Sequence, residues 1–199
     1  MMSRWIRTWN GKYLAPLLRG LQSLGVSLDA LTLLGLLAEL AAGALLAIGQ
    51  WGWAPAALLL GQVLDSLDGE LARVQQNATA FGGFLDSICD HYGDLAVYLG
   101  LLWYLLRAEQ PLGVVLVALA LFGSVFGSHV RSRAGMAGID TKDVGLFTRF
   151  ERTAVLLLGI LLNQIIIALA VLAIFANFSA LQRIWRVVRE HGLPRRKAA

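Results

Sequence analysis

Long runs of apolar residues, separated by short polar or charged stretches, form the main pattern of the sequence. The runs cover about residues 31–48, a segment that starts near Pro55, and residues 83–106, 112–130 and 153–178. A helix needs roughly 20 mostly apolar residues to cross a bilayer. The pattern therefore predicts an all-α integral membrane protein.

The last run, 153–178, fits either one long helix or two helices with a break near Asn163-Gln164. The distribution of charge favours two helices, because cytoplasmic loops carry an excess of Lys and Arg. The N-terminus, the 131–152 loop and the C-terminal tail are all basic. Both termini are therefore expected on the cytoplasmic side, which requires an even number of spans. We predict six transmembrane helices, with a short fifth span and a sixth that continues as a helix into the cytoplasm.

The turns expected on the opposite side carry little charge. The 49–54 turn has none, and the 107–111 turn has only Arg107 and Glu109. Charged residues make up 15% of the chain, its mean hydropathy is +0.65 and its formal net charge is +4. A soluble domain averages about 25% charged residues. The positive charge is therefore expected to lie in cytoplasmic loops, and we expect no nucleic-acid partner. A single cysteine, Cys89, excludes an intrachain disulfide.

The two ends of the chain differ in composition from the membrane domain that we predict for residues 23–190. Residues 1–22 mix Trp, Tyr and Leu with Arg and Lys, a composition that favours an amphipathic helix at the membrane surface. A partly ordered basic tail is the alternative, because Gly11 and Pro16 disfavour a helix there. Residues 191–199 form a basic C-terminal tail.

Four aspartates stand close together in this apolar chain: Asp65, Asp68, Asp86 and Asp90. At 3.6 residues per turn, the first pair shares a face of the second span and the second pair shares a face of the third. The two spans are antiparallel neighbours joined by a short link, so their faces can meet. The alternative is a set of solvated charges at helix ends, with Asp68 paired to Arg73.

Such a cluster is costly inside a membrane and its charges repel one another. Divalent cations remove both costs, and carboxylate oxygens favour hard ions such as Mg²⁺, Mn²⁺ or Ca²⁺. Four carboxylates suit two divalent ions, which can stabilise both sides of a phosphoryl transfer. Cys89 points away from the face that the ligands share. Asp94 lies one helical turn beyond Asp90, and we leave it outside the site.

The segment resembles the signature of the CDP-alcohol phosphotransferase family, D-x-x-D-G-x-x-A-R-x8-G-x3-D-x3-D. Every fixed position matches: Asp65, Asp68, Gly69, Ala72, Arg73, Gly82, Asp86 and Asp90. Members of this family transfer a phosphoalcohol group from a CDP-alcohol to a second alcohol and release CMP. The predicted six spans agree with the fold of the family, which usually forms homodimers.

The resemblance implies a role for each matching residue. Asp65, Asp68 and Asp86 are expected to bind Mg²⁺ or Mn²⁺, and Asp90 to join them and act as general base on the acceptor hydroxyl. Nucleotide binding is expected of Gly69, Ala72, Arg73 and Gly82. Upstream, GVSLDALTLLG resembles the family's entry to the first span, GxSPNxLTxxG. Asp29 there is a further candidate for the nucleotide site, and the alternative is that Ser27 or Asp29 only caps a helix.

The acceptor should be chosen by the second half of the chain. The stretch SHVRSRAGMAGIDTKDVGLFTRFERT resembles the pattern of family members that use inositol phosphate, with departures at His129, Arg131, Ser132 and Gly135. Five basic residues could bind an acceptor phosphate: Arg131, Arg133, Lys142, Arg149 and Arg152. Positive charge that only sets the topology is the alternative explanation. Residues 179–183 resemble a family segment that we expect to be architectural.

We therefore expect an enzyme of the cell membrane with its active site facing the cytoplasm. It would use a CDP-lipid such as CDP-diacylglycerol and a phosphorylated alcohol, with inositol phosphate ahead of glycerol 3-phosphate. Two other classes use similar residues. An intramembrane prenyltransferase would place its two Asp-rich motifs in separate halves of the protein. A divalent-cation transporter would need a polar path across the membrane, whereas the outer halves of the spans are almost purely apolar.

Overall fold

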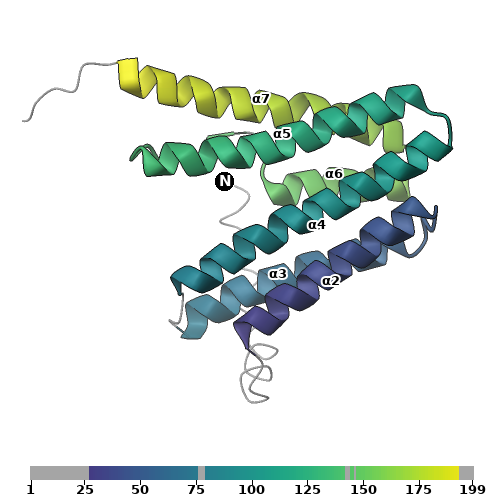
Figure 1. Cartoon of the computed structure of the whole chain (residues 1–199), viewed down its shortest axis with the longest axis horizontal. Helices are drawn as coiled ribbons and strands as arrows, with labels where there is room; N and C mark the ends of the chain where they lie inside the picture. The colour runs from purple at the N-terminus through teal and green to yellow at the C-terminus, as the bar shows by residue number, and fades with distance from the viewer. Residues whose placement is uncertain (1–26, 76–78, 142–143, 146, 193–199) are drawn as a thin grey trace, which may run out of the picture. The chain divides into compact units, whose positions relative to one another are not determined.

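A computed structural model describes residues 27–75, 79–141, 144–145 and 147–192, and within the helices it leaves the side chains of residues 69–75, 191 and 192 undescribed. The described residues form helices and no strands, as predicted (Figure 1). Their helices are α2 (Leu28–Ala47), α3 (Ala54–Gln75), α4 (Ala80–Arg107), α5 (Pro111–Met136), α6 (Arg149–Leu161) and α7 (Ile165–Gly192). The predicted surface helix (1–22) and most of the basic tail (191–199) lie outside the described residues.

The apolar run near the C-terminus is divided into two helices, as the charge pattern predicted. Helix α6 ends at Leu161 and α7 begins at Ile165. Asn163 has a positive φ of 56°, a conformation that non-glycine residues seldom adopt outside turns. Gln164 donates its backbone N–H to Gly159 O at 2.7 Å, which closes the turn. Helix α7 then runs on to Gly192, in agreement with the predicted extension.

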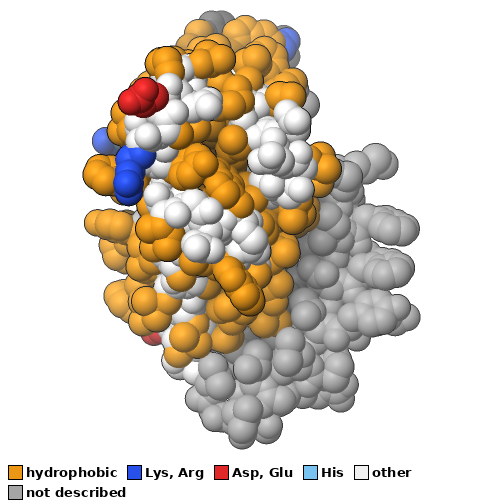
Figure 2. All heavy atoms as spheres, turned by 90° about the vertical axis from the view of Figure 1, so that its right-hand side faces the viewer, with side chains coloured by type: hydrophobic (Ala, Val, Ile, Leu, Met, Phe, Trp, Pro, Cys, Tyr) orange, Lys and Arg blue, Asp and Glu red, His pale blue; other side chains and the backbone are white. Residues whose placement is uncertain are grey.

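Three of these helices are long and apolar enough to cross a membrane: α2, α5 and the Ile165–Glu190 part of α7. Helices α3 and α4 are long, but each carries aspartates in one half. With 13 residues at about 1.5 Å each, α6 is about 20 Å long and shorter than a hydrocarbon core of roughly 30 Å. Large apolar side chains such as Leu37, Trp103 and Phe122 are more than half exposed. Hydrophobic side chains also dominate the coloured face in Figure 2.

The described chain divides into two compact units. The first comprises residues up to Leu45 together with Gly52–Val97, and thus α2, α3 and the first part of α4. Glycines let the backbones of its helices approach closely, since a Cβ atom at Gly43 of α2 would overlap the backbone of Ala96 in α4. Gly35 of α2 similarly faces Gly61 of α3, with 3.6 Å between an ideal Cβ and the Gly61 oxygen.

The second unit comprises Leu46–Trp51 and the chain from Tyr98 onward. In it, α7 packs against both α5 and α6. Leu169 and Leu172 of α7 are fully buried. Asn177 of α7 donates its side-chain amide to Leu119 O of α5 at 2.9 Å. The end of α5, the following loop and the start of α6, which carry the basic residues of the predicted acceptor site, therefore belong to the same unit as α7.

Replacing Gly43 by alanine should destabilise the first unit. The added methyl group would meet the α4 backbone, which cannot rotate away, and such overpacking costs about 1–3 kcal/mol. We expect a lower apparent melting temperature in detergent, followed by circular dichroism. Gly135→Ala is the matched control, because nothing lies within 4 Å of the added Cβ atom. An equal loss of stability in both variants would contradict the close approach of α2 and α4.

Candidate functional site

Three of the four predicted carboxylates come together in the first unit. Oxygen atoms of Asp65, Asp68 and Asp86 all lie within 4.8 Å of one another. Asp68 is buried, and Asp65 and Asp86 are half-buried. The first two side chains come from the last turns of α3 and the third from the second turn of α4. The predicted meeting of the two helix faces is therefore confirmed for these three residues.

Asp90, the fourth predicted ligand, is not among the three residues whose oxygens gather. It lies one helical turn after Asp86 on α4 and is half-buried. Its expected roles as metal ligand and general base stay predictions. Cys89 between them is buried, in agreement with a place off the ligand face.

A hydroxyl group from α2 forms a hydrogen bond with one of the three clustered carboxylates. The Thr32 side chain donates a hydrogen bond of 2.6 Å to Asp68 Oδ2. The same hydroxyl lies 3.2 Å from Leu28 O, but its single hydrogen favours the shorter contact with the charged oxygen. Sequence reasoning missed Thr32 as a site residue. The signal was present in the stretch GVSLDALTLLG, where Thr32 follows Asp29 by three residues and so shares its side of the helix.

The predicted nucleotide residues are only partly covered by the structure. Gly69, Ala72 and Arg73 lie in α3, but their side chains are outside the described part. Gly82 lies in the first turn of α4, where its N–H donates to Thr79 Oγ1 at 2.9 Å. Asp29 is exposed in the first turn of α2. Ser27 caps that helix through a 3.2 Å hydrogen bond from Ala30 N–H, which leaves the Asp29 carboxylate available to a ligand.

The basic residues predicted to bind an acceptor phosphate lie in the second unit. Arg131 and Arg133 are exposed near the end of α5, and Arg149 and Arg152 are half-buried in the first turn of α6. Lys142 lies outside the described residues. Arg131 and Arg133 are two residues apart on a helix and therefore point in different directions. Arg131 and Arg152 lie near enough to Arg183 of α7 for their charges to act on it.

Arg183 belongs to the segment that the sequence marked as architectural, and its contacts agree with that role. The side chain is only 6% exposed. Its Nε donates to Val144 O at 3.0 Å, and a terminal guanidinium nitrogen donates to Gly127 O at 2.8 Å. These bonds join α7 to α5 and to the loop between α5 and α6.

The two clusters are suited to opposite kinds of ligand. Three carboxylate oxygens with a supporting hydroxyl match the donor set of a hard divalent cation. The guanidinium groups of the arginines in the second unit are suited to bind a phosphate, which arginine binds with paired hydrogen bonds. One cluster would thus hold a cation and the other an anionic group.

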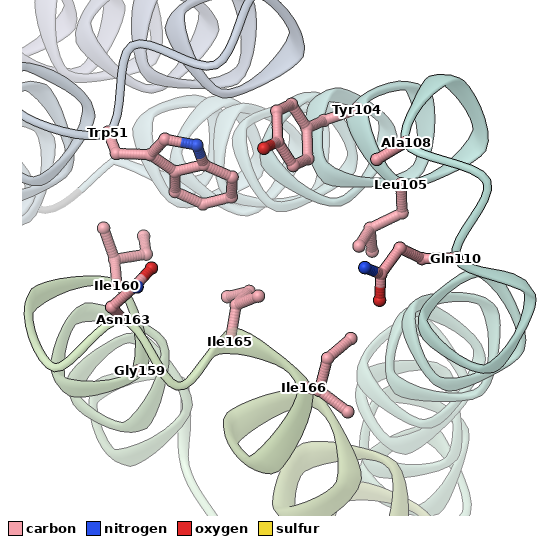
Figure 3. A pocket seen from close by; sticks show the side chains of 10 residues that line it. All are labelled: Trp51, Tyr104, Leu105, Ala108, Gln110, Gly159, Ile160, Asn163, Ile165 and Ile166. Atoms are coloured by element: carbon pink, nitrogen blue, oxygen red, sulfur yellow. The ribbon is translucent and has the colours of Figure 1, made fainter.

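A pocket of about 170 Å³ in the second unit is separate from these residues (Figure 3). Its lining is mostly apolar, with Trp51 and Tyr104 in edge-to-face contact at 4.7 Å. Gln110 and Asn163 supply amide groups. The residues that line the pocket include none of the predicted aspartates or arginines.

Comparison with known proteins shows what family this arrangement represents. The family model of CDP-alcohol phosphatidyltransferases matches residues 28–184. Archaetidylinositol phosphate synthase of Pyrococcus horikoshii is 34% identical over 83% of this chain and 85% of its own length. Phosphatidylinositol phosphate synthase of Mycolicibacterium smegmatis is 32% identical over 86% of this chain and 82% of its own length.

Solved structures give the same result. Phosphatidylinositol phosphate synthase of Mycobacterium tuberculosis with CDP-DAG bound superposes with a TM-score of 0.79 and 29% identity, covering 87% of this chain and 92% of that one. The same enzyme in complex with manganese and citrate also gives a TM-score of 0.79, with 86% and 87% covered. The extent of these matches, together with the gathered aspartates, establishes that the chain belongs to the CDP-alcohol phosphatidyltransferase family.

Proposed function

We propose that this protein transfers the phosphoalcohol group of a CDP-lipid to inositol phosphate and releases CMP, with Mg²⁺ or Mn²⁺ as cofactor. The observation that carries the proposal is the gathering of Asp65, Asp68 and Asp86 oxygens within 4.8 Å. The relatives named above are synthases of inositol phosphate lipids. One solved structure of the Mycobacterium tuberculosis enzyme holds CDP-DAG, and another structure of the same enzyme holds manganese. Since these relatives carry either archaetidyl or phosphatidyl names, the donor is stated only as a CDP-lipid.

The residues of the first unit would bind and orient the donor. Asp65, Asp68 and Asp86 would hold the metal, with Thr32 fixing the orientation of the Asp68 carboxylate. Bound divalent ions neutralise charge on the diphosphate and stabilise CMP as a leaving group. The N-terminus of α4, with Gly82 in its first turn, would favour a phosphate group nearby. Arg73, Gly69, Ala72 and Asp29 are proposed contacts of the nucleotide.

The transfer itself is one substitution at phosphorus. The acceptor hydroxyl oxygen bonds to the lipid-side phosphorus of the diphosphate, and the bond from that phosphorus to the oxygen bridging to CMP breaks. The electron pair of the broken bond leaves with CMP. Asp90 takes the proton of the hydroxyl, as a half-buried carboxylate one turn from Asp86 can do.

Arginines in the second unit would select a phosphorylated acceptor. Arg131 and Arg152, whose charges act on the buried Arg183, are proposed contacts of the acceptor phosphate. Arg149, in the same helical turn as Arg152, and Arg133 and Lys142 remain proposed contributors. A phosphate group would form charge-assisted hydrogen bonds with such residues that a neutral acceptor such as serine or free inositol could not form. Glycerol 3-phosphate carries the same kind of phosphate and is the second candidate acceptor.

We further propose that six helices cross the cell membrane, with both termini and the aspartates on the cytoplasmic side. The basic 131–152 loop and the nearly uncharged 49–54 and 107–111 turns support this orientation. Local thinning of the bilayer or snorkelling of flanking side chains would accommodate the short α6. A homodimer is expected from the family, and the exposed apolar faces of the helices suit either lipid or a second copy.

The purified protein should release CMP from CDP-diacylglycerol in the presence of Mn²⁺ or Mg²⁺ and inositol phosphate. Asp86→Asn should lower this rate by more than about 100-fold, because removing even a residue that supports a metal ligand costs about 10–100-fold. The measurement is CMP formation with inositol phosphate, glycerol phosphate, inositol and serine as acceptors. The control is Asp140→Asn, because Asp140 is exposed and is not one of the three clustered carboxylates.

Three results would overturn this proposal, and a fourth would change only the acceptor. Full activity of the Asp86→Asn protein would exclude the metal-bound mechanism. Metal uptake into proteoliposomes without turnover of any CDP-lipid would favour the transporter. Turnover of a prenyl diphosphate without CMP release would favour the prenyltransferase. A preference for glycerol phosphate over inositol phosphate would keep the chemistry and replace the acceptor.

Arg152→Gln should raise the KM for inositol phosphate by about 10-fold or more, because a hydrogen bond to a charged group is worth about 1.5–3 kcal/mol. The KM for the CDP-lipid should change little, since no donor contact is proposed for Arg152. Arg186→Gln is the matched control, because Arg186 pairs with Glu190 on the surface of α7. An unchanged acceptor KM in Arg152→Gln would remove this residue from the acceptor site.

Single cysteines should report the orientation in the membrane. Cys89→Ser removes the only native thiol, after which Gly52→Cys or Asp140→Cys introduces one at an exposed position. In intact spheroplasts, an impermeant maleimide should label Gly52→Cys and leave Asp140→Cys unlabelled until the membrane is opened. Labelling in the reverse order would invert the proposed orientation.

A further inference from the structure

A buried glutamate on α2 has no place in the chemistry described so far. Glu39 is only 5% exposed and lies in a helix that is apolar enough to span a membrane. Apart from Asp29 in the first turn, it is the one ionisable residue of α2. Ionisable groups within a membrane span are costly and usually face the interior of the bundle with a partner. Glu39 also lies outside the eight fixed positions of the aspartate signature.

The Glu39 side chain is held between two neighbouring helices at positions where both have glycine. A Cβ atom at Gly61 of α3 would lie 2.8 Å from Glu39 Cγ. A Cβ atom at Gly93 of α4 would overlap Glu39 Oε2 and lie 2.7 Å from Cδ. Gln62, next to Gly61, donates a long hydrogen bond of 3.4 Å to Glu39 Oε1. The carboxyl group therefore fills space that alanine at either glycine would occupy.

The contacts of α2 with α3 show how far Glu39 lies from the aspartates along the axis of α3. Thr32 meets Asp68 of α3, and Glu39, seven residues later, meets Gly61, seven residues earlier. The two helices are therefore antiparallel and in register. Gly61 precedes Asp65 by four residues, so Glu39 lies about one helical turn from Asp65 along α3.

The contacts of α2 with α4 likewise place Glu39 about one helical turn from the aspartates. Glu39 meets Gly93 and Gly43 meets Ala96, so α2 and α4 run parallel. Gly93 follows Asp90 by three residues, and Glu39 therefore lies about one turn beyond Asp90. The glutamate thus separates α3 from α4 one turn away from the carboxylates that these helices contribute.

We propose that Glu39 is a positioning residue that sets the separation of α3 and α4 by the length and hydrogen bonding of its side chain. Asp65 and Asp68 come from α3 and Asp86 from α4, so this separation determines the spacing of the three carboxylates. A metal site tolerates only about 0.2 Å of change in its ligand distances. The inference rests on the proposed function in one respect, namely that the three carboxylates bind a divalent cation.

Two substitutions of Glu39 distinguish the effect of side-chain length from the effect of charge. Glu39→Asp keeps the charge but shortens the side chain by one methylene, so α3 and α4 lose their spacer. Glu39→Gln keeps the length and can still accept from Gln62, so the spacing is retained. Mn²⁺ titration of the purified protein, followed by electron paramagnetic resonance, measures binding without turnover. We expect Glu39→Asp to weaken Mn²⁺ binding by about 10-fold and Glu39→Gln to stay within about twofold of wild type.

Leu46→Ala is the control for a loss of packing, because Leu46 is fully buried at the other end of α2. It should lower the melting temperature without changing Mn²⁺ affinity. Unchanged affinity in Glu39→Asp, an equal loss in Glu39→Gln, or an equal loss in Leu46→Ala would each overturn the positioning role. CMP release is measured separately, so a wild type that binds Mn²⁺ but turns over no CDP-lipid would contradict the proposed function and leave this test standing.

Discussion

The mutual repulsion of carboxylates in an apolar surrounding is the constraint on which the first unit depends. Two like charges about 4 Å apart repel by about 4 kcal/mol at an effective dielectric constant near 20. Asp65, Asp68 and Asp86 hold oxygens within 4.8 Å of one another, in helices whose other positions are largely apolar. The arrangement is therefore stable only with compensation, and a divalent cation offers the largest part of it. The hydroxyl group of Thr32 offers a smaller part.

The same constraint accounts for the small residues around the aspartates. Three helices must approach closely for their side chains to meet, and a Cβ atom at Gly43, Gly61 or Gly93 would collide with a neighbouring helix or with Glu39. A glutamate between two glycines supplies a defined separation. The packing of α2 thus belongs to the site, although α2 contributes none of the three carboxylates.

Much of this could be predicted from the sequence because its signals are local or periodic. Apolar runs and loop charge predicted the helices and the break near Asn163, and helical spacing predicted the meeting of Asp65, Asp68 and Asp86. Thr32, Glu39 and Arg183 were missed, or given only an architectural role, because each acts across helices. Nothing in the spacing along α2 says which α3 or α4 residue will face it. The six membrane crossings rest on the apolar runs and the loop charge, since three helices in the described part of the chain meet the length and apolarity of a span.

The carboxylates and the arginines are carried by different parts of the chain. The carboxylates, which are proposed to hold the metal that binds the donor diphosphate, come from α3 and α4 in the first unit. The arginines sit at the end of α5, the start of α6 and on α7, joined by a loop that Arg183 fastens through backbone oxygens of Gly127 and Val144. Although those oxygens are backbone atoms, the fastening also constrains one loop position, because a Cβ atom at Gly145 would lie 3.1 Å from a guanidinium nitrogen of Arg183. The sequence of the loop and its attachment to α7 are therefore linked, and the arginines proposed to select the acceptor lie on the elements that Arg183 joins.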